Sequence, residues 1–333
     1  SRIAEDKARL ECLVARLDRA GESYTAGDVV KLYLTPSNRE DFFTFTRMLI
    51  GQLRQVGKTH TAERYVTVMN SFGRFRRENE LLWEEVDSDL MVEYETYLKS
   101  RGVCPNTSSY YMRGLRAIYN RAVEKGKTVQ REPFKYVYTG IDKTIKRAVP
   151  LKVIRQIRDL DLTLFPTMDF ARDIFMFSFY TRGMSFIDMA YLKKKDLKSG
   201  VLTYRRQKTG RRLSIKWEKP MQEIVDKYNT NGTPYLLPII RDMNADIRRQ
   251  YKNAAHLVND KLKKLGEKLG LTVPLTSYVA RHGWASIARS RNIPLAIISE
   301  AMGHDSEKTT RIYLASLDTT SVDKANSRIL KAL

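Results

Sequence analysis

The chain has 333 residues, of which 42% are hydrophobic, and a chain of this length usually folds as two domains. Its 59 lysines and arginines outnumber 38 aspartates and glutamates, giving a formal net charge of +21, which attracts polyanions: nucleic acid, an anionic membrane surface or an acidic protein. The sequence has no run of about 18 apolar residues and opens with no secretory signal, so we expect no membrane partner and a cytoplasmic location.

Cysteine and histidine are sparse. Cys12 and Cys104 lie in stretches of helical pattern and are expected to be reduced structural thiols. Together with four histidines they form no zinc-ligand spacing, so we expect no bound metal. The chain begins at Ser1 rather than at methionine, as a piece of a longer protein would.

The first part of the chain has helical periodicity. Apolar spacing predicts helices over 5–21, 39–56, 61–75, 88–101 and 106–125, with Ser88 and Asn106 as N-caps of the last two. On the 106–125 helix Arg113, Arg116 and Asn120 share one face, opposite an apolar stripe. This face is either a reader of DNA phosphates and bases or an ordinary solvated basic face.

Residues 127–150 lose this periodicity and predict a linker between domains. The linker is basic, with Lys143, Lys146 and Arg147 close to Pro150. Cations at this spacing suit a segment that follows a DNA backbone, and they equally suit a linker that is only solvated.

The second part mixes helix and strand. Helices are expected from 151 and over 169–180, and again from about 244 to the end. Alternating runs at 201–206 and 212–215 flank Gly210 and predict a β-hairpin, with 235–237 as a candidate third strand. The expected fold class is therefore mainly α with a small hairpin or three-stranded sheet.

Two short motifs near the end of the chain carry chemistry. Tyr278 and Arg281 are three residues apart, which puts them on one face of a predicted helix, where a guanidinium can fork onto phosphate oxygens. Further on, Gly303 and His304 precede Tyr313, which lies nine residues after the histidine. A phenol is a poor nucleophile at its ordinary pKa of about 10, and a nearby imidazole would help it react.

The hairpin contributes a third motif, because Arg206 and Lys208 alternate onto one face beside its turn. Taken singly, each of these motifs has a plain structural explanation. A tyrosine on a helix usually belongs to a core or its rim, a Gly-His pair usually ends a helix, and surface cations are usually solvated. Their order and spacing together favour a site that acts on a phosphodiester.

This order resembles the tyrosine recombinases, the phage integrase family. The stretches 180–189 and 277–282 look most like integrases of mobile elements in the Bacteroides group. The resemblance implies an N-terminal helical coupling segment at 1–37, a helical, SAM-like core-binding domain at 38–140 and a basic linker at 141–150. It further implies a catalytic domain at 151–320 and a tail helix at 321–333, which either docks on a neighbouring protomer or folds back.

Two positions depart from the family pattern. Tyr278 occupies the place of a histidine, and a phenol can hydrogen-bond a phosphate oxygen but cannot shuttle a proton near neutral pH. Ser185 occupies the place of the first arginine, three residues before Asp188. We expect Arg182 to supply this charge, with Arg206 as the alternative. The plain structural explanation for Arg182 is an ion pair with Asp188 or a helix end.

The resemblance also implies a mechanism. Tyr313 attacks the scissile phosphate and forms a 3′-phosphotyrosine, Arg281 and a second arginine neutralise the phosphate, and Lys208 protonates the leaving 5′-oxygen. Tyr278 and His304 contact the phosphate, and His304 helps to position or deprotonate the phenol. Because the covalent intermediate stores the bond energy and side chains supply the cations, no metal, ATP or other cofactor is expected.

The implied partners are double-stranded recombination sites, three further copies of the chain in a tetrameric synapse, and host DNA-bending or directionality factors. The implied setting is a bacterial nucleoid, and the event is integration, excision or inversion of mobile DNA. Two rival interpretations are strand relaxation of the type IB topoisomerase kind and a DNA-binding regulator with weakened catalysis. The departures at Tyr278 and Ser185 motivate the second.

Overall fold

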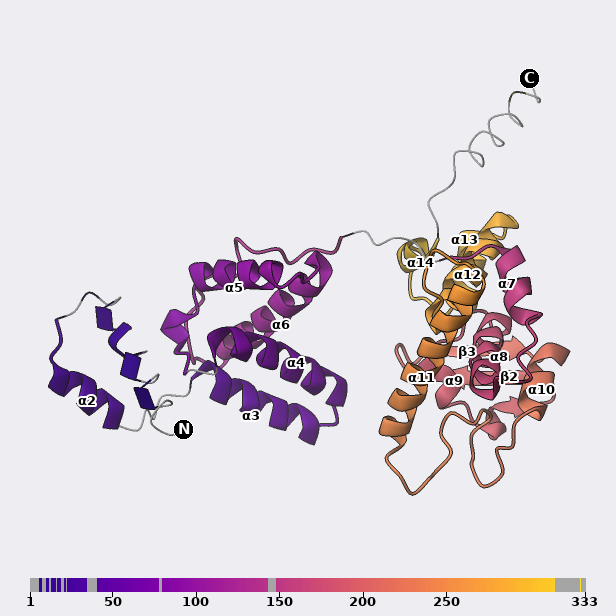
Figure 1. Ribbon diagram of the computed structural model, residues 1–333, viewed down its shortest axis with the longest axis horizontal. Coiled ribbons are helices and arrows are strands. Elements are labelled where there is room, and N and C mark those ends of the chain that lie inside the picture. The colour runs from indigo at the N-terminus through magenta and orange to yellow at the C-terminus, as the bar shows by residue number, and fades with distance from the viewer. Residues whose placement is uncertain are drawn as a thin grey trace. The chain divides into compact units, whose positions relative to one another are not determined.

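The computed structural model describes residues 6–7, 10–11, 13–15, 17–18, 21, 23–34, 41–77, 80–142, 148–314 and 330, with the backbone alone for Leu32, Leu34, Ile312 and Tyr313. The chain divides into two compact units, residues 1–144 and 145–333 (Figure 1). Residues 5, 8, 9, 12, 16, 19 and 20 of the predicted helix at 5–21, the cations Lys143, Lys146 and Arg147, and the tail 321–333 apart from Leu330 lie outside the described residues.

The N-terminal unit is helical. Its elements are α2 (Ala26–Leu34), α3 (Phe42–Gln55), α4 (Thr59–Arg76), the 3-10 turn η1 (Trp83–Glu85), α5 (Ser88–Ser100) and α6 (Pro105–Glu124). Helix α4 packs against both α3 and α6. At the α4–α6 contact a Cβ on Gly114 would lie 2.5 Å from Val68 Cγ2, so glycine permits this close approach. Phenylalanine and tyrosine rings in edge contact fill much of the core.

Two predicted N-caps in this unit are wrong by one or two residues. Helix α5 is capped by Asp87, whose carboxylate accepts from Leu90 N, rather than by Ser88. Helix α6 begins after Cys104, with Pro105 rather than Asn106 at its start. Proline suits the first position of a helix because its missing N–H would have no partner there. Cys104 is exposed, so it is not a buried structural thiol.

The C-terminal unit surrounds one central helix. Helix α8 (Pro166–Tyr180) packs against α7 (Leu151–Arg158), α10 (Lys219–Asp226), α11 (Ile247–Lys268) and α12 (Ser277–Ser290). The short helices are α9 (Phe186–Ala190), the 3-10 turn η2 (Lys194–Asp196), α13 (Leu295–Ala301) and α14 (Glu307–Tyr313). Buried α8 residues such as Ile174, Phe175 and Phe177 place this helix in the core.

A small antiparallel sheet lies in the same unit. Its strands are β1 (Leu197–Lys198), β2 (Val201–Arg205) and β3 (Arg212–Lys216), in the order β1-β2-β3. The predicted hairpin is confirmed, with Val201 opposite Lys216 and Arg205 opposite Arg212. The third strand is β1 rather than 235–237, because Tyr235 makes only an isolated bridge to Lys193 and the buried Leu236 and Leu237 belong to the core.

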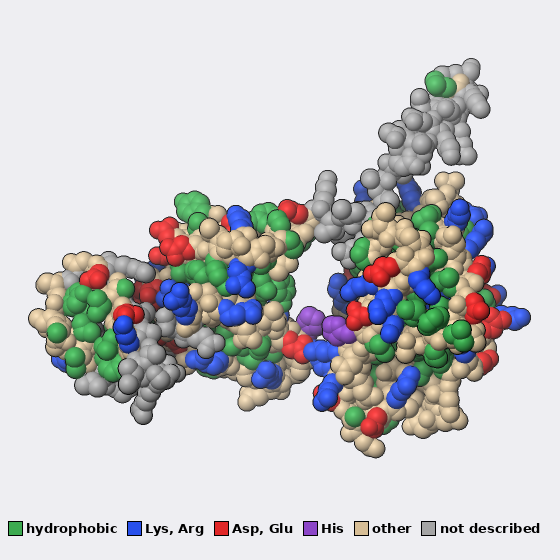
Figure 2. All heavy atoms as spheres, in the orientation of Figure 1, with side chains coloured by type: hydrophobic (Ala, Val, Ile, Leu, Met, Phe, Trp, Pro, Cys, Tyr) green, Lys and Arg blue, Asp and Glu red, His purple; other side chains and the backbone are tan. Residues whose placement is uncertain are grey.

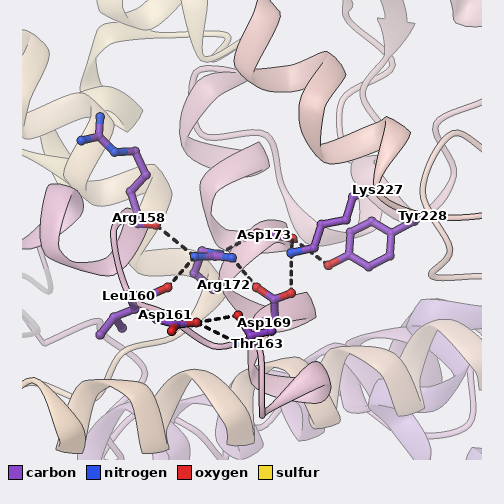
Figure 3. Close-up of polar contacts among 9 residues, drawn as sticks. All are labelled: Arg158, Leu160, Asp161, Thr163, Asp169, Arg172, Asp173, Lys227 and Tyr228. Carbon is purple, nitrogen blue, oxygen red and sulfur yellow. Dashed lines mark hydrogen bonds and ion pairs between the residues drawn. The ribbon is translucent and has the colours of Figure 1, made fainter.

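A polar network fixes the first half of α8 (Figure 3). Arg172 binds Asp169 and, through Nε at 2.6 Å, Asp173, and it also donates to two carbonyls at and just beyond the end of α7. Lys227 and Tyr228, just after α10, each donate to Asp173 at 2.7 Å. The carboxylates are largely shielded from solvent, so their partners offset the cost of burying charge. The network therefore anchors α7, α8 and α10 as one scaffold.

The expected fold class is confirmed: the described residues are mainly helical and carry one small three-stranded sheet. Among them, no helix combines the length and the apolar character needed to cross a bilayer.

Candidate active site

Arg281 lies on the second turn of α12 with only 3% of its surface exposed. Its guanidinium donates to the carbonyl oxygens of Gly183, at 2.6 Å, and Met302, at 2.8 Å. Gly183 has a φ of 74°, and a Cβ there would lie 2.7 Å from Arg281 Cα. Glycine is therefore required on both counts, since it tolerates a positive φ and lets the backbone approach the helix.

His304 is held at the end of α13 by the turn that the Gly-His pair predicted. Gly303 has a φ of 65°, and the amide of His304 donates to Ser299 O at 3.0 Å, which closes the helix in the manner of a glycine C-cap. The imidazole is 5% exposed. The turn thus places a buried imidazole beside Arg281.

The hydrogen bonds of His304 define its tautomer. Nε2 lies 2.7 Å from Arg281 Nη2, and Nδ1 lies 2.8 Å from Oγ1 of the buried Thr310. A guanidinium can only donate, so Nε2 accepts and Nδ1 carries the proton. Burial and the cations Arg281, Arg206, Lys208 and Arg211 lower the pKa of His304 from 6.5 to about 3. His304 is therefore neutral at physiological pH.

Arg206 follows β2 directly and is buried. Its Nη1 donates to Gly303 O at 2.6 Å, and its Nε lies 3.8 Å from Asp188 Oδ2. Gly303 leaves room for it, because a Cβ there would lie 2.8 Å from Arg206 Cδ. Lys208 lies in the hairpin turn and is exposed. Arg206 continues the alternation that buries Leu202 and Tyr204, which directs its side chain into the core.

Arg182 directly precedes Gly183, whose carbonyl accepts from Arg281. It is half-buried with a φ of 61°, and its guanidinium donates to Ser214 O on β3 at 3.4 Å. Ser185 caps α9 and its hydroxyl donates to Asp188 at 2.5 Å. Asp188 also accepts from Gln207 N and pairs with Arg206. The ion pair with Asp188 that the sequence suggested for Arg182 is thus made by Arg206.

The two tyrosines of the predicted site differ in position. Tyr278 is 48% exposed and its ring meets His282 edge-on at 5.0 Å, whereas Arg281, expected on the same face, is buried. Tyr313 is the last residue of α14, and its side chain lies outside the described residues. Ser306 caps this helix, because its side chain accepts from Thr309 N. Helix α14 packs against α12 and α13.

The α6 residues predicted to contact DNA have partners within their own unit. Arg113 Nε donates to Ser109 O at 3.3 Å, Arg116 donates to Thr139 Oγ1 at 3.4 Å, and Asn120 accepts from Gln130 at 3.3 Å. Arg116 and Asn120 are exposed and Arg113 is half-buried. Figure 2 shows further Lys and Arg side chains on the displayed face of both units.

Sequence reasoning missed two residues of this cluster. Thr310 contacts the imidazole of His304, and Arg211 Nη1 donates to His304 O at 2.6 Å. The signal for Thr310 was its place between His304 and Tyr313, on the helix that carries the tyrosine. Arg211 gave no signal of its own, because it is one of several cations around the hairpin turn.

Comparison with known families agrees with both units. The phage integrase SAM-like domain model matches residues 41–144, and the phage integrase family model matches residues 166–320. This chain belongs to the phage integrase family. Tyrosine recombinase XerA of Pyrococcus furiosus is 27% identical over 52% of this chain, which spans 58% of that protein's length.

Two further relatives extend the likeness over most of the chain. Tyrosine recombinase XerC of Syntrophus aciditrophicus is 25% identical over 77% of this integrase-family chain and 87% of its own. A lambda integrase tetramer bound to a Holliday junction is similar in fold, with a TM-score of 0.64 at 14% identity over 92% of this chain and 85% of that one.

Proposed function

We propose that this integrase-family protein is a site-specific DNA recombinase that cleaves and rejoins DNA through a 3′-phosphotyrosine at Tyr313. The observation that carries the proposal is a buried cluster of Arg206, Arg281 and His304 beside the turn that bears Lys208. The ion pair between Arg206 and Asp188 lies in this cluster, and Arg281, Lys208 and Arg211 add positive charge around the imidazole. A cluster with this charge is suited to a phosphodiester.

The proposed roles follow from these positions. Tyr313 forms the new P–O bond while the bond from phosphorus to the 5′-oxygen breaks, and Lys208 transfers a proton to the departing oxygen. Arg281 and a second arginine stabilise the charge on the non-bridging oxygens. Neutral His304 holds Arg281 in place because its Nε2 accepts from the guanidinium, and a bound phosphodiester would raise its lowered pKa by adding a negative charge among the cations. Tyr278, being exposed, is proposed as a hydrogen-bond donor to the DNA backbone.

Arg206 is the better supported second clamp, in contrast to the sequence-based preference for Arg182. Arg206 is buried, donates to the residue next to His304 and is among the cations that lower the pKa of that imidazole. Arg182 instead donates a hydrogen bond to Ser214 O on β3. Cleavage should therefore fall by about 10²- to 10³-fold in Arg206→Ala and by much less in Arg182→Ala. The reverse order would reassign the clamp to Arg182.

The test of the reaction is a nicked suicide substrate carrying the protein's own recombination site, mapped from the junctions that flank its gene. The protein should form a covalent adduct with this DNA, and Tyr313→Phe should form none. An intact protein that binds the site without forming an adduct would refute the recombinase and favour a DNA-binding regulator. A relaxation assay run in parallel detects topoisomerase activity without strand exchange.

The same proposal extends to partners and setting. We assign DNA binding to the helical unit, through Arg113, Arg116 and Asn120, and to the basic linker. Catalysis is assigned to the C-terminal unit. A tetramer on two DNA duplexes is supported by the tetrameric lambda integrase that shares the fold. The motifs at 180–189 and 277–282 support an integrase of a mobile element in the Bacteroides group, acting on nucleoid DNA with host bending or directionality factors.

A further inference from the structure

The hairpin turn that carries Lys208 is attached to the Gly303–His304 segment at both of its ends. Arg206 begins the turn and Arg211 ends it, and the amide of Arg206 donates to Arg211 O at 2.9 Å. Arg206 donates to the carbonyl of Gly303 and Arg211 to that of His304, each at 2.6 Å. The two guanidinium groups of the hairpin turn thus bind the successive carbonyls of Gly303 and His304.

The turn carries three cations close together, and the two carbonyl acceptors partly offset the repulsion between them. Lys208, Arg206 and Arg211 all lie close enough to lower the proton affinity of His304, so the three cations also repel one another. Lys208 is exposed, so the position of its ammonium group depends on the position of the turn. A hydrogen bond from a charged donor is stronger than one between neutral groups, so two such bonds can hold the turn in one place.

The two arginines differ in what else they do. Arg206 is buried and pairs with Asp188, so its loss would disturb the proposed phosphate clamp directly. Arg211 is half-buried, and its guanidinium donates to His304 O. The neighbouring Arg212 is exposed on β3. A substitution at Arg211 therefore tests the attachment of the turn without removing the proposed phosphate clamp, Arg206.

We propose that Arg211 is a positioning residue that holds the β2–β3 turn against His304, so that Lys208 lies where it can protonate the leaving 5′-oxygen. The inference rests on the proposed function and deepens it. In this role Arg211 acts through the turn that carries Lys208, by way of its bond to His304 O. Its effect on the reaction passes through the proton that Lys208 delivers to the oxygen as the bond from phosphorus breaks.

A substrate with sulfur in place of the bridging 5′-oxygen tests this. A thiolate departs without a proton, so a defect in proton delivery disappears on the sulfur substrate while a defect in phosphate binding or folding remains. Arg211→Met should form adduct at least about tenfold more slowly on the oxygen substrate, part of the roughly 10²- to 10⁴-fold that a general acid supplies. On the sulfur substrate it should match the unaltered protein, as should Lys208→Ala.

The controls separate the remaining outcomes. Arg212→Met removes the same charge one residue away and should cleave both substrates normally. Arg211→Lys keeps a donor and should retain part of the oxygen rate, which guards against a methionine variant that folds poorly. Equal impairment of Arg211→Met on both substrates, or none on either, overturns the inference. No adduct from the unaltered protein on either substrate refutes the proposed function itself, and with it this role.

Discussion

Lowering the pH from about 7 to about 5.5 should destabilise the C-terminal unit through His304. Its imidazole is buried beside Arg281, and its pKa is lowered to about 3. Between this value and the 6.5 of an unfolded histidine, only the unfolded chain binds the proton. The stability contributed by the neutral imidazole is therefore complete above pH 6.5 and is lost as the pH falls toward 3. For these two values the loss over the stated interval is about 1 kcal/mol.

Urea unfolding followed by tryptophan fluorescence measures this loss. Trp217 and Trp284 report on the C-terminal unit, and Trp83→Phe removes the signal of the N-terminal unit. His304→Asn in the same background removes the titrating group. The parent should lose about 1 kcal/mol more than this variant between the two pH values. Equal losses in the two proteins would refute the reasoning, because other groups would then carry the whole pH dependence.

Three further predictions test the site and the DNA-binding face. Gly183→Ala should destabilise the protein by about 1 to 3 kcal/mol more than Gly200→Ala in thermal unfolding. Both glycines have a positive φ, but only at Gly183 would a Cβ collide with Arg281, and equal effects would contradict the packing argument. Thr310→Val should cost about 1 to 3 kcal/mol by leaving Nδ1–H of the imidazole without its acceptor, whereas Thr310→Ser should be close to the parent. Arg116→Ala should weaken DNA binding evenly across sequences and lower the slope of log affinity against log salt by about 1; an unchanged slope in fluorescence anisotropy would remove Arg116 from the interface.

Local structure followed from local pattern. The helix predicted over 61–75 is α4 (Thr59–Arg76), and the predicted hairpin is β2 and β3, because burial of one face imposes a period of 3.6 or 2 on the sequence. The wrong predictions concern positions where two nearby residues or segments suit the same structural role. Ser88 and Asp87 are both good caps, and the backbone geometry before α5 selected Asp87. The third strand was misplaced because an apolar run such as 235–237 suits a buried coil as well as a strand.

The sequence alone determined the order and spacing of Arg281, His304 and Tyr313, and hence the family and the chemistry to look for. Only the tertiary structure brought the arginines to their acceptors. Arg281 binds Gly183 O and Arg206 binds Gly303 O across 98 and 97 residues of chain. Such contacts leave no periodicity in the sequence, because a carbonyl acceptor is the same for every residue. The second clamp, the attachment of the Lys208 turn and the tautomer of His304 all depend on them.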